Sequence, residues 1–195
     1  MHRGEHEHNI LSIWKRAAGK SKGTIIDCGG YNGIFGLVAA KVNPDANIII
    51  IEPDHININH IKYNIKLNNL NNITIIPAVV SDCMGTVMFQ SDGGHSGGFI
   101  ANVGTNVQSV MLDNYKNVSL VKIDIEGAEY QALIGGQNMV ESGVNILLEL
   151  HKDFLDRFFA TESDIWNLLR KYDYKNLFLH TTKINEEHYW IYKGK

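Results

Sequence analysis

The sequence has little cysteine and no long apolar run. Only two cysteines, Cys28 and Cys83, occur among the 195 residues, which excludes a small domain stapled by disulfides. No stretch approaches the roughly 18 to 20 apolar residues of a membrane span, and the first residues do not form the apolar segment of a secretory signal. We therefore expect a cytoplasmic protein in which both cysteines are buried free thiols.

An excess of positive charge is also lacking. The 18 lysines and arginines are outnumbered by 21 aspartates and glutamates, and the formal net charge is −3. The basic residues are scattered along the chain, whereas nucleic-acid and anionic-membrane partners need a basic cluster. With 44% hydrophobic residues, the chain is long enough for one filled core. The composition favours a small polar substrate, with no nucleic-acid and no membrane partner.

A third absence is the dinucleotide-binding glycine spacing. The stretch 24–36 reads TIIDCGGYNGIFG, and its glycines fall in no register that supplies G-x-G-x-x-G. The stretch nevertheless contains an apolar strand that ends in Asp27, a glycine-rich turn and the apolar start of a helix. Glycines in such a turn let a ligand approach the backbone, and the helix start offers unpaired N–H groups. We interpret this stretch as a turn that holds the polar part of a nucleotide-like ligand.

Apolar, β-branched runs alternate with amphipathic segments along the rest of the chain. This alternation predicts the strands of a parallel sheet, covered on both faces by helices. The predicted strands of this sheet cover 25–27, 47–51, 73–78, 120–125 and 145–150, followed by a hairpin of 174–179 and 188–192; a further short strand is predicted over 107–112. The predicted helices cover 34–43, 55–67, 128–139 and 161–172, with a weaker one from 10 to 17. Residues 91–98, SDGGHSGG, are expected to form a loop that acts as a lid or as a wall of the substrate site.

Acidic side chains and one histidine stand where the predicted strands end. They are Asp27, Glu52, Asp124, Glu126, Glu149 and His151. In an open parallel sheet, the carboxyl ends of the strands border the ligand crevice. Glu52 ends the strand that follows the glycine turn, where an acidic side chain in nucleotide-binding folds accepts hydrogen bonds from ribose hydroxyls.

Six sequence blocks resemble, in order and spacing, those of the FkbM family of O-methyltransferases. They are IIDCGGYNG, IIIIEP, IKYNIKLNN, PAVVSD followed by Gly85, VKIDIEGAE and LLELH, and they run from about residue 23 to 151. The resemblance implies the class I methyltransferase fold, an α/β Rossmann-like architecture. Its central seven-stranded sheet is mostly parallel, the last strand is antiparallel, and helices cover both faces. We expect a helical lead-in over 1–22 and a single methyltransferase domain over 23–195.

The resemblance also implies S-adenosyl-L-methionine as the cofactor and assigns parts of it to matching residues. The methionine end and the reacting methyl group would contact Asp27, Gly29, Gly30, Tyr31, Gly33 and Asp124. The ribose would contact Glu52, with Pro53 beside it. The adenine would be bordered by Ala78, Ser81 and Asp82. The methyl acceptor would face Glu126, Glu149 and His151.

Tyr31 departs from the family pattern, which usually has asparagine at this position of the loop. If the position is left-handed, tyrosine costs roughly 1 to 2 kcal/mol that glycine or asparagine would not. We expect either a shifted loop or a tyrosine that covers the cofactor as a flap.

By resemblance, the expected reaction is in-line transfer of a methyl group to a hydroxyl of a small molecule or sugar, which needs alignment and a base. His151 is the first candidate for the base because a histidine pKa lies near neutrality. Asp124 or Glu126 is the second candidate. The preferred mechanism uses no metal, although a divalent cation on Asp124, Glu126 and Glu149 is an alternative.

Two other functions stay open at this point. One is a catalytically silent protein that binds S-adenosylmethionine, and the other is a nicotinamide-dependent oxidoreductase, which would share the ribose carboxylate but lacks the required glycine spacing. Since little of the chain lies outside the expected core, the acceptor pocket must draw on residues 91–118, the N-terminal helix or a second subunit. A homodimer is therefore one possibility.

Overall fold

The computed structural model describes residues 3–183 and 185–194 and contains two sheets. The larger sheet has seven strands in the order β10-β11-β9-β8-β1-β2-β3. Its strands are β1 (Thr24–Cys28), β2 (Asn47–Ile51), β3 (Ile73–Ile76), β8 (Val118–Ile123), β9 (Asn145–His151), β10 (Tyr174–Lys183) and β11 (Glu186–Lys193). The strands from β3 to β9 pair in parallel, and β11 pairs antiparallel with both β9 and β10. The predicted mostly parallel sheet with an antiparallel last strand is confirmed.

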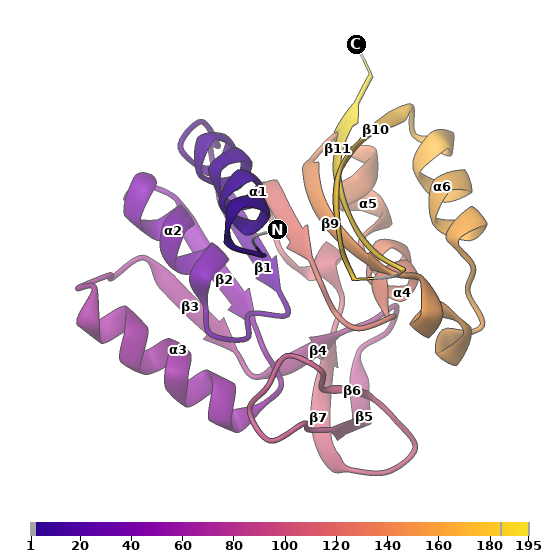
Figure 1. Ribbon diagram of the computed structural model, residues 1–195, viewed down its shortest axis with the longest axis horizontal. Helices are drawn as coiled ribbons and strands as arrows, with labels where there is room; N and C mark the ends of the chain where they lie inside the picture. Colours follow the sequence, from indigo (N-terminus) through magenta and orange to yellow (C-terminus); the bar gives the residue numbers. More distant parts are fainter. Residues whose placement is uncertain (1–2, 184, 195) are drawn as a thin grey trace.

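Helices cover both faces of this sheet (Figure 1). One face packs against α1 (Arg3–Ala18), α2 (Ile34–Val42) and α3 (His55–Leu67). The other face packs against α4 (Glu129–Ile134), α5 (Gln137–Glu141) and α6 (Glu162–Lys171). Neighbouring residues of a strand point to opposite sides, so Ile25 joins the first core and Ile26 the second. This is why the strands are unbroken apolar runs rather than alternating ones.

Side chains cap two of the predicted helices at their starts. The Asp54 carboxylate accepts hydrogen bonds from the backbone N–H groups of Ile56 and Asn57 at the start of α3. Thr161 caps α6 and forms a reciprocal capping box with Asp164. Both caps satisfy donors that the first helical turn leaves unpaired.

The smaller sheet was not predicted as a separate unit. It has the order β4-β7-β5-β6, from β4 (Ala78–Val80), β5 (Gly85–Gln90), β6 (Phe99–Ile100) and β7 (Thr105–Val110). The predicted strand 73–78 splits at Pro77, because proline has no N–H for the ladder and β3 ends at Ile76. The small sheet then lies beyond the carboxyl edge of the larger one, at the bottom of Figure 1. Residues 91–98 form the predicted loop within it.

The predicted helix 128–139 is broken into α4 and α5 at Gly135 and Gly136. A Cβ atom at Gly135 would lie 2.1 Å from the carbonyl oxygen of Ser81. The break therefore lets the chain pass directly against the turn after β4. Short 3₁₀ segments, η1 (Leu112–Asn114) and η2 (Lys152–Phe158), complete the described elements.

The two cysteines lie in different surroundings. Cys28 is a buried free thiol at the end of β1, and burial raises its pKa. Cys83 is a free thiol too, but it is exposed in the turn between β4 and β5. The expectation that both are buried is wrong for Cys83, because the chain leaves the core after β4 and residues 82–84 form an exposed turn. Among the described residues, no helix combines the length and apolarity that crossing a membrane requires.

Candidate active site

A pocket lies between the carboxyl edge of the large sheet and the small sheet. It encloses about 630 Å³ of space, the open solvent at its mouth included. Its walls come from the ends of β1, β2 and β8, from β4, and from the loop before β6. The predicted site residues that line it are Gly29, Tyr31, Glu52, Pro53, Ala78, Asp124 and Glu126.

The glycine turn joins β1 to its neighbours without room for side chains. Gly29 has φ +76°, and a Cβ atom there would lie 1.8 Å from the carbonyl oxygen of Asp124. A Cβ atom at Gly30 would lie 2.3 Å from the side chain of Ile50. Gly33 caps α2 with φ 85°. These glycines hold the backbone of the turn against β2 and β8, so that the pocket wall here is main chain.

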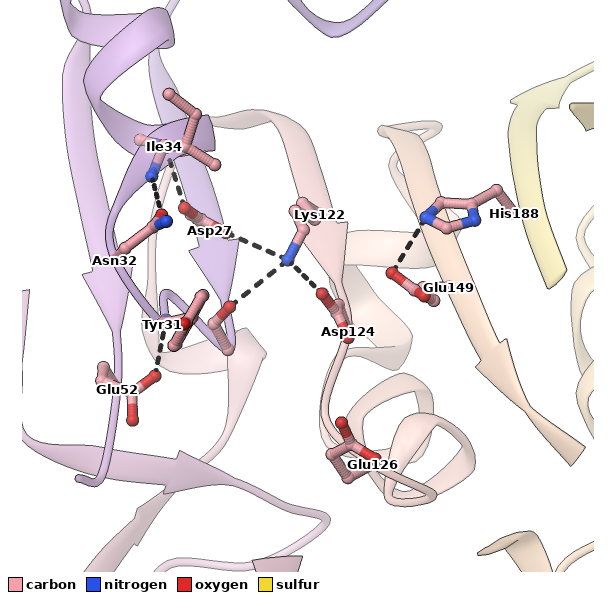
Figure 2. A network of polar contacts seen from close by, with 12 residues as sticks. Asp27, Tyr31, Asn32, Ile34, Glu52, Lys122, Asp124, Glu126, Glu149 and His188 are labelled. Carbon is pink, nitrogen blue, oxygen red and sulfur yellow. Dashed lines mark hydrogen bonds and ion pairs between the residues drawn. The ribbon is translucent and has the colours of Figure 1, made fainter. Parts of the chain in front are cut away.

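The backbone of Tyr31 is in the left-handed conformation, in which a tyrosine is strained. Its φ is 47°, its side chain is 38% exposed, and it lines the pocket. Its backbone N–H donates to Oε2 of Glu52 at 2.8 Å. Tyr31 therefore carries the strain of this conformation at the pocket wall, and Figure 2 shows its contact with Glu52.

Replacing Tyr31 by asparagine should stabilise the fold by about 1 kcal/mol, since asparagine tolerates the left-handed region and keeps the N–H bond to Glu52. Urea unfolding of the two proteins measures the difference. Asn69 is another left-handed residue, and it already is asparagine, so Asn69→Tyr is the matched reverse change and should destabilise by a similar amount. An unchanged or lower stability of Tyr31→Asn would contradict the assignment of strain to this position.

Glu52 is buried with its carboxylate held by two backbone donors. Oε1 accepts from the N–H of Asp54 at 2.9 Å and Oε2 from that of Tyr31. Burial raises the pKa of Glu52, and these two hydrogen bonds oppose the rise. Beside it, Oδ1 of Asn57 is buried without a hydrogen-bond partner among the described residues, while Nδ2 donates to the carbonyl of His95 in the loop over the pocket. The remaining lone pairs of Glu52 and Asn57 suit a ligand rich in hydroxyl and amino donors.

A buried lysine ties two of the strand-end carboxylates together. Lys122 of β8 is 3% exposed, and its Nζ lies 2.8 Å from Oδ2 of Asp124 and 3.5 Å from Oδ1 of Asp27 (Figure 2). It also donates to the carbonyl of Gly29 at 3.3 Å. Burial lowers the pKa of Lys122, but the charges of Asp124 and Asp27 outweigh it and raise the pKa above the usual lysine value. Asp27 is thus buried behind the turn, where it also accepts the N–H of Gly36.

Asp124, Glu126 and His151 converge at the far end of the pocket. Nε2 of His151 lies 3.7 Å from Oε2 of Glu126 and 3.9 Å from Oδ1 of Asp124. Nδ1 of His151 lies 2.9 Å from Oε1 of Glu129, which is fully buried at the start of α4. Burial of the ring lowers the pKa of His151, but the hydrogen bond to Glu129 and the three carboxylate charges raise it to about 10. His151 is therefore a cation at neutral pH.

Glu126 combines backbone strain with a shifted pKa. Its φ is 55°, a conformation that non-glycine residues adopt mainly where a site requires it. Burial, opposed by His151 and helped by Asp124, raises the pKa of Glu126 to about 7. A carboxylate of this pKa on a pocket wall can exchange a proton near neutral pH.

Comparison with known proteins decides the family. A model of the family described as "Methyltransferase FkbM domain" matches residues 27–175. The chain belongs to the FkbM methyltransferase family. It is a methyltransferase that depends on S-adenosylmethionine. No curated protein sequence matches this FkbM methyltransferase.

Solved structures agree on the fold of this FkbM methyltransferase. Precorrin-6y C5,15-methyltransferase from Geobacter metallireducens GS-15 is 14% identical with a TM-score of 0.61, over 95% of this chain and 88% of that one. An rRNA methylase from Streptococcus thermophilus is 9% identical with a TM-score of 0.60, over 98% and 97%. TYW2 from M. jannaschii, in complex with AdoMet, is 15% identical with a TM-score of 0.54, over 93% and 73%. At these identities the similarity shows the fold alone.

The residues present in the FkbM methyltransferase fit the cofactor. The pocket offers a buried carboxylate in Glu52, an unpartnered buried amide oxygen in Asn57 and a main-chain wall at Gly29. These groups would hold the adenosyl part, and Asp124 would hold the amino group of the methionine part.

Other predicted residues of the FkbM methyltransferase lie outside the pocket lining. They are Asp27, Gly30, Gly33, Ser81, Asp82 and His151. Asp27 and the two glycines support the turn from behind, and His151 stands behind Asp124 and Glu126. Ser81 is buried and bonded to Asp82, which is exposed. Glu149 does not join Asp124 and Glu126; its Oε2 lies 2.9 Å from Nε2 of His188.

The cluster that could hold a cation differs from the predicted one. Among the described residues, single donor atoms of Asp124, Glu126 and His151 lie within 4.8 Å of one another, as do those of Glu149, His151 and Glu186. The combination of Asp124, Glu126 and Glu149 is not formed. In the first cluster, Oδ2 of Asp124 already contacts Lys122, and Oδ1 faces His151.

Two charged residues of the FkbM methyltransferase site were missed in the sequence. Lys122 interrupts the apolar strand LVKI, and Glu129 follows the small pair Gly127-Ala128. A charge inside a strand covered on both faces requires a buried partner, and that signal points to Lys122. Glu129 gives no such signal, because an acidic residue in the first turn of a helix is ordinary.

Proposed function

We propose that this FkbM methyltransferase transfers the methyl group of S-adenosylmethionine to a hydroxyl oxygen of a small acceptor, with Glu126 as the base. The observation that carries the proposal is a pocket-lining carboxylate whose pKa is raised to about 7. An alcohol is a poor nucleophile until its proton leaves, and a positioned base contributes about 10² to 10⁴ in rate. An amine acceptor that is already neutral would need no such group.

Glu126 is favoured over His151, the first candidate from the sequence. With a pKa of about 10, His151 is protonated at neutral pH and has no free lone pair to accept a proton. Its Nε2–H faces Glu126 and Asp124. His151 is then a cation that orients Glu126 and limits the rise of the Glu126 pKa. Glu129 holds the ring of His151 in place.

The remaining residues of the site would bind and align. S-adenosylmethionine supplies an already electrophilic methyl group when bound, so alignment by the protein can contribute roughly 7 to 11 kcal/mol. Glu52 and Asn57 would bind the adenosyl part, and the loop 91–98 would exclude water above them. Glu126 would take the hydroxyl proton on the acceptor side of the pocket.

Methyl transfer from tritium-labelled S-adenosylmethionine tests the proposal. The purified chain is incubated with hydroxylated sugars, polyketides and lipid headgroups, and the product is analysed by mass spectrometry. We expect an alkali-stable methyl ether on at least one acceptor. Label on nitrogen would contradict the oxygen assignment. Binding of S-adenosylhomocysteine with no transfer to any hydroxyl would instead support the silent cofactor-binding protein.

A further inference from the structure

Arg157 stands beside the active site with aromatic rings as its neighbours. It belongs to η2, the segment that follows His151, and it is exposed. Its Cζ atom lies 3.9 Å from the ring centroid of Phe154 and 4.3 Å from that of Phe99. A guanidinium over aromatic rings is held by its π faces, which leaves its N–H edges free for a planar acceptor.

The lysines at the same edge of the sheet have different neighbours. Lys122 is paired with Asp27 and Asp124, and Lys152 with Glu162 and Glu187. Among the side chains that the structure describes, no carboxylate forms an ion pair with Arg157. The positive charge of Arg157 is therefore not neutralised by any of these carboxylates.

Arg157 lies near the side of the pocket that would hold the methyl acceptor. Phe154 stacks on the ring of His151 with 6.0 Å between centroids and an interplanar angle of 4°. Together with the 3.9 Å contact to Phe154, this places the guanidinium within about 10 Å of the His151 ring. Phe99, the other ring, lines the pocket itself. An acceptor whose hydroxyl reaches Glu126 can therefore extend to Arg157 along Phe99.

The acidic groups nearby do not forbid an anion at this place. Glu129 is bonded to His151, Glu149 to His188, and Glu187 to Lys152. Each of these carboxylates already has a partner that reduces its repulsion of a second anion.

We propose that Arg157 is a specificity-determining residue that binds an oxyanion, carboxylate or phosphate, on the methyl acceptor. The substrate class is then a hydroxylated compound that also carries an acid group, placed so that it reaches Arg157 along Phe99 while the hydroxyl reaches Glu126. Arginine binds such groups through two parallel hydrogen bonds, which fixes orientation as well as charge. The inference rests on the proposed function for its reaction, and it adds the chemistry of the acceptor.

Calorimetric titration of the protein loaded with S-adenosylhomocysteine tests this assignment. The probes are inorganic phosphate, glucose 6-phosphate, glucuronate and, as the neutral counterpart, glucose. We expect the charged sugars to bind at least tenfold more tightly than glucose, and the better of the two identifies the acid group. Arg157→Ala should lower the affinity for the charged sugars at least tenfold without changing the affinity for S-adenosylhomocysteine, and Arg157→Lys should fall between the two.

Arg170→Ala is the matched control, because Arg170 is an exposed arginine of α6 that contacts the carbonyl of Trp166. It should bind every probe as the unmodified protein does. Equal binding of glucose and the charged sugars, or charged-sugar binding that survives Arg157→Ala, overturns the assignment. Two measurements separate the two proposals. If the protein fails to bind S-adenosylhomocysteine, the result counts against the proposed function. The oxyanion titrations, repeated without S-adenosylhomocysteine, would still test the role of Arg157.

Discussion

Glu126→Gln should lower kcat by about 10² to 10⁴ while leaving the affinity for S-adenosylhomocysteine unchanged. Glutamine keeps the shape of Glu126 and can still contact His151, but it cannot accept the proton of the acceptor hydroxyl. The loss should appear in kcat, because the interaction with the proton changes only as the reaction proceeds. Single-turnover kinetics with labelled S-adenosylmethionine measure it, with cofactor-product affinity from calorimetry.

The pH profile gives an independent check on the same residue. Activity requires ionised Glu126, so kcat/KM should rise as the pH increases through about 7. It should fall again near pH 10, where His151 loses its proton. Glu141→Gln, at an exposed glutamate of α5, is the control and should keep both the rate and the profile. A flat profile between pH 5.5 and about 8.5, or a kcat for Glu126→Gln close to that of the control, would remove Glu126 as the base.

Lys122→Met should destabilise the fold by about 3 to 5 kcal/mol. Methionine fills similar space on β8, but Asp27 and Asp124 lose the cation that lies between them. Breaking a buried ion pair by removing one partner leaves uncompensated charge, which costs this much in proteins. Urea unfolding at pH 7.5 measures the change in the free energy of unfolding. Lys116→Met, at an exposed lysine just before β8, is the control and should stay within about 0.5 kcal/mol.

The deficit of Lys122→Met should shrink as the pH is lowered toward 5. Burial already raises the pKa of Asp27, and Lys122 opposes the rise, so removing the lysine raises that pKa further. A carboxyl group with a folded-state pKa above its unfolded value near 3.9 binds a proton more readily when folded. Its contribution to stability is therefore present at low pH and is lost as the pH rises through the folded pKa. A deficit that is the same at pH 5 and pH 7.5 would mean that the cost comes from packing and not from charge.

The order of the strands and helices could be predicted from the sequence because each of them has its own periodic pattern of apolar residues. The run Ile48–Ile51 is apolar on every residue, since both sides of β2 are covered. The sequence also predicts that the acidic residues at the strand ends lie close together, because parallel strands bring their carboxyl ends to one edge of the sheet. Glu52, Asp124 and Glu126 do line one pocket.

The small sheet escaped prediction because two of its strands, β4 and β6, are very short and the other two, β5 and β7, are largely exposed. β6 has two residues and β4 has three, too few for a period to be recognised. The break between α4 and α5 does have a local signal, the glycine pair Gly135-Gly136, which the predicted helix 128–139 ran through. The close approach of Gly135 to Ser81, by contrast, has no signal in a short stretch of sequence.

The sequence by itself determined the fold class and the gathering of Glu52, Asp124 and Glu126 at one edge of the sheet, because these depend on periodicity and strand order. Only the tertiary structure shows how burial and neighbouring charges shift the pKa values of His151 and Glu126, on which our proposal of Glu126 as the base rests. His151 was preferred for an ordinary pKa near neutrality, yet Glu129, Asp124 and Glu126 surround it and raise that pKa to about 10. The pKa of a buried group is set by the charges packed around it, and those around His151, at the end of β9, come from the loop after β8 and from the start of α4. That convergence has no signature in any one stretch of the chain.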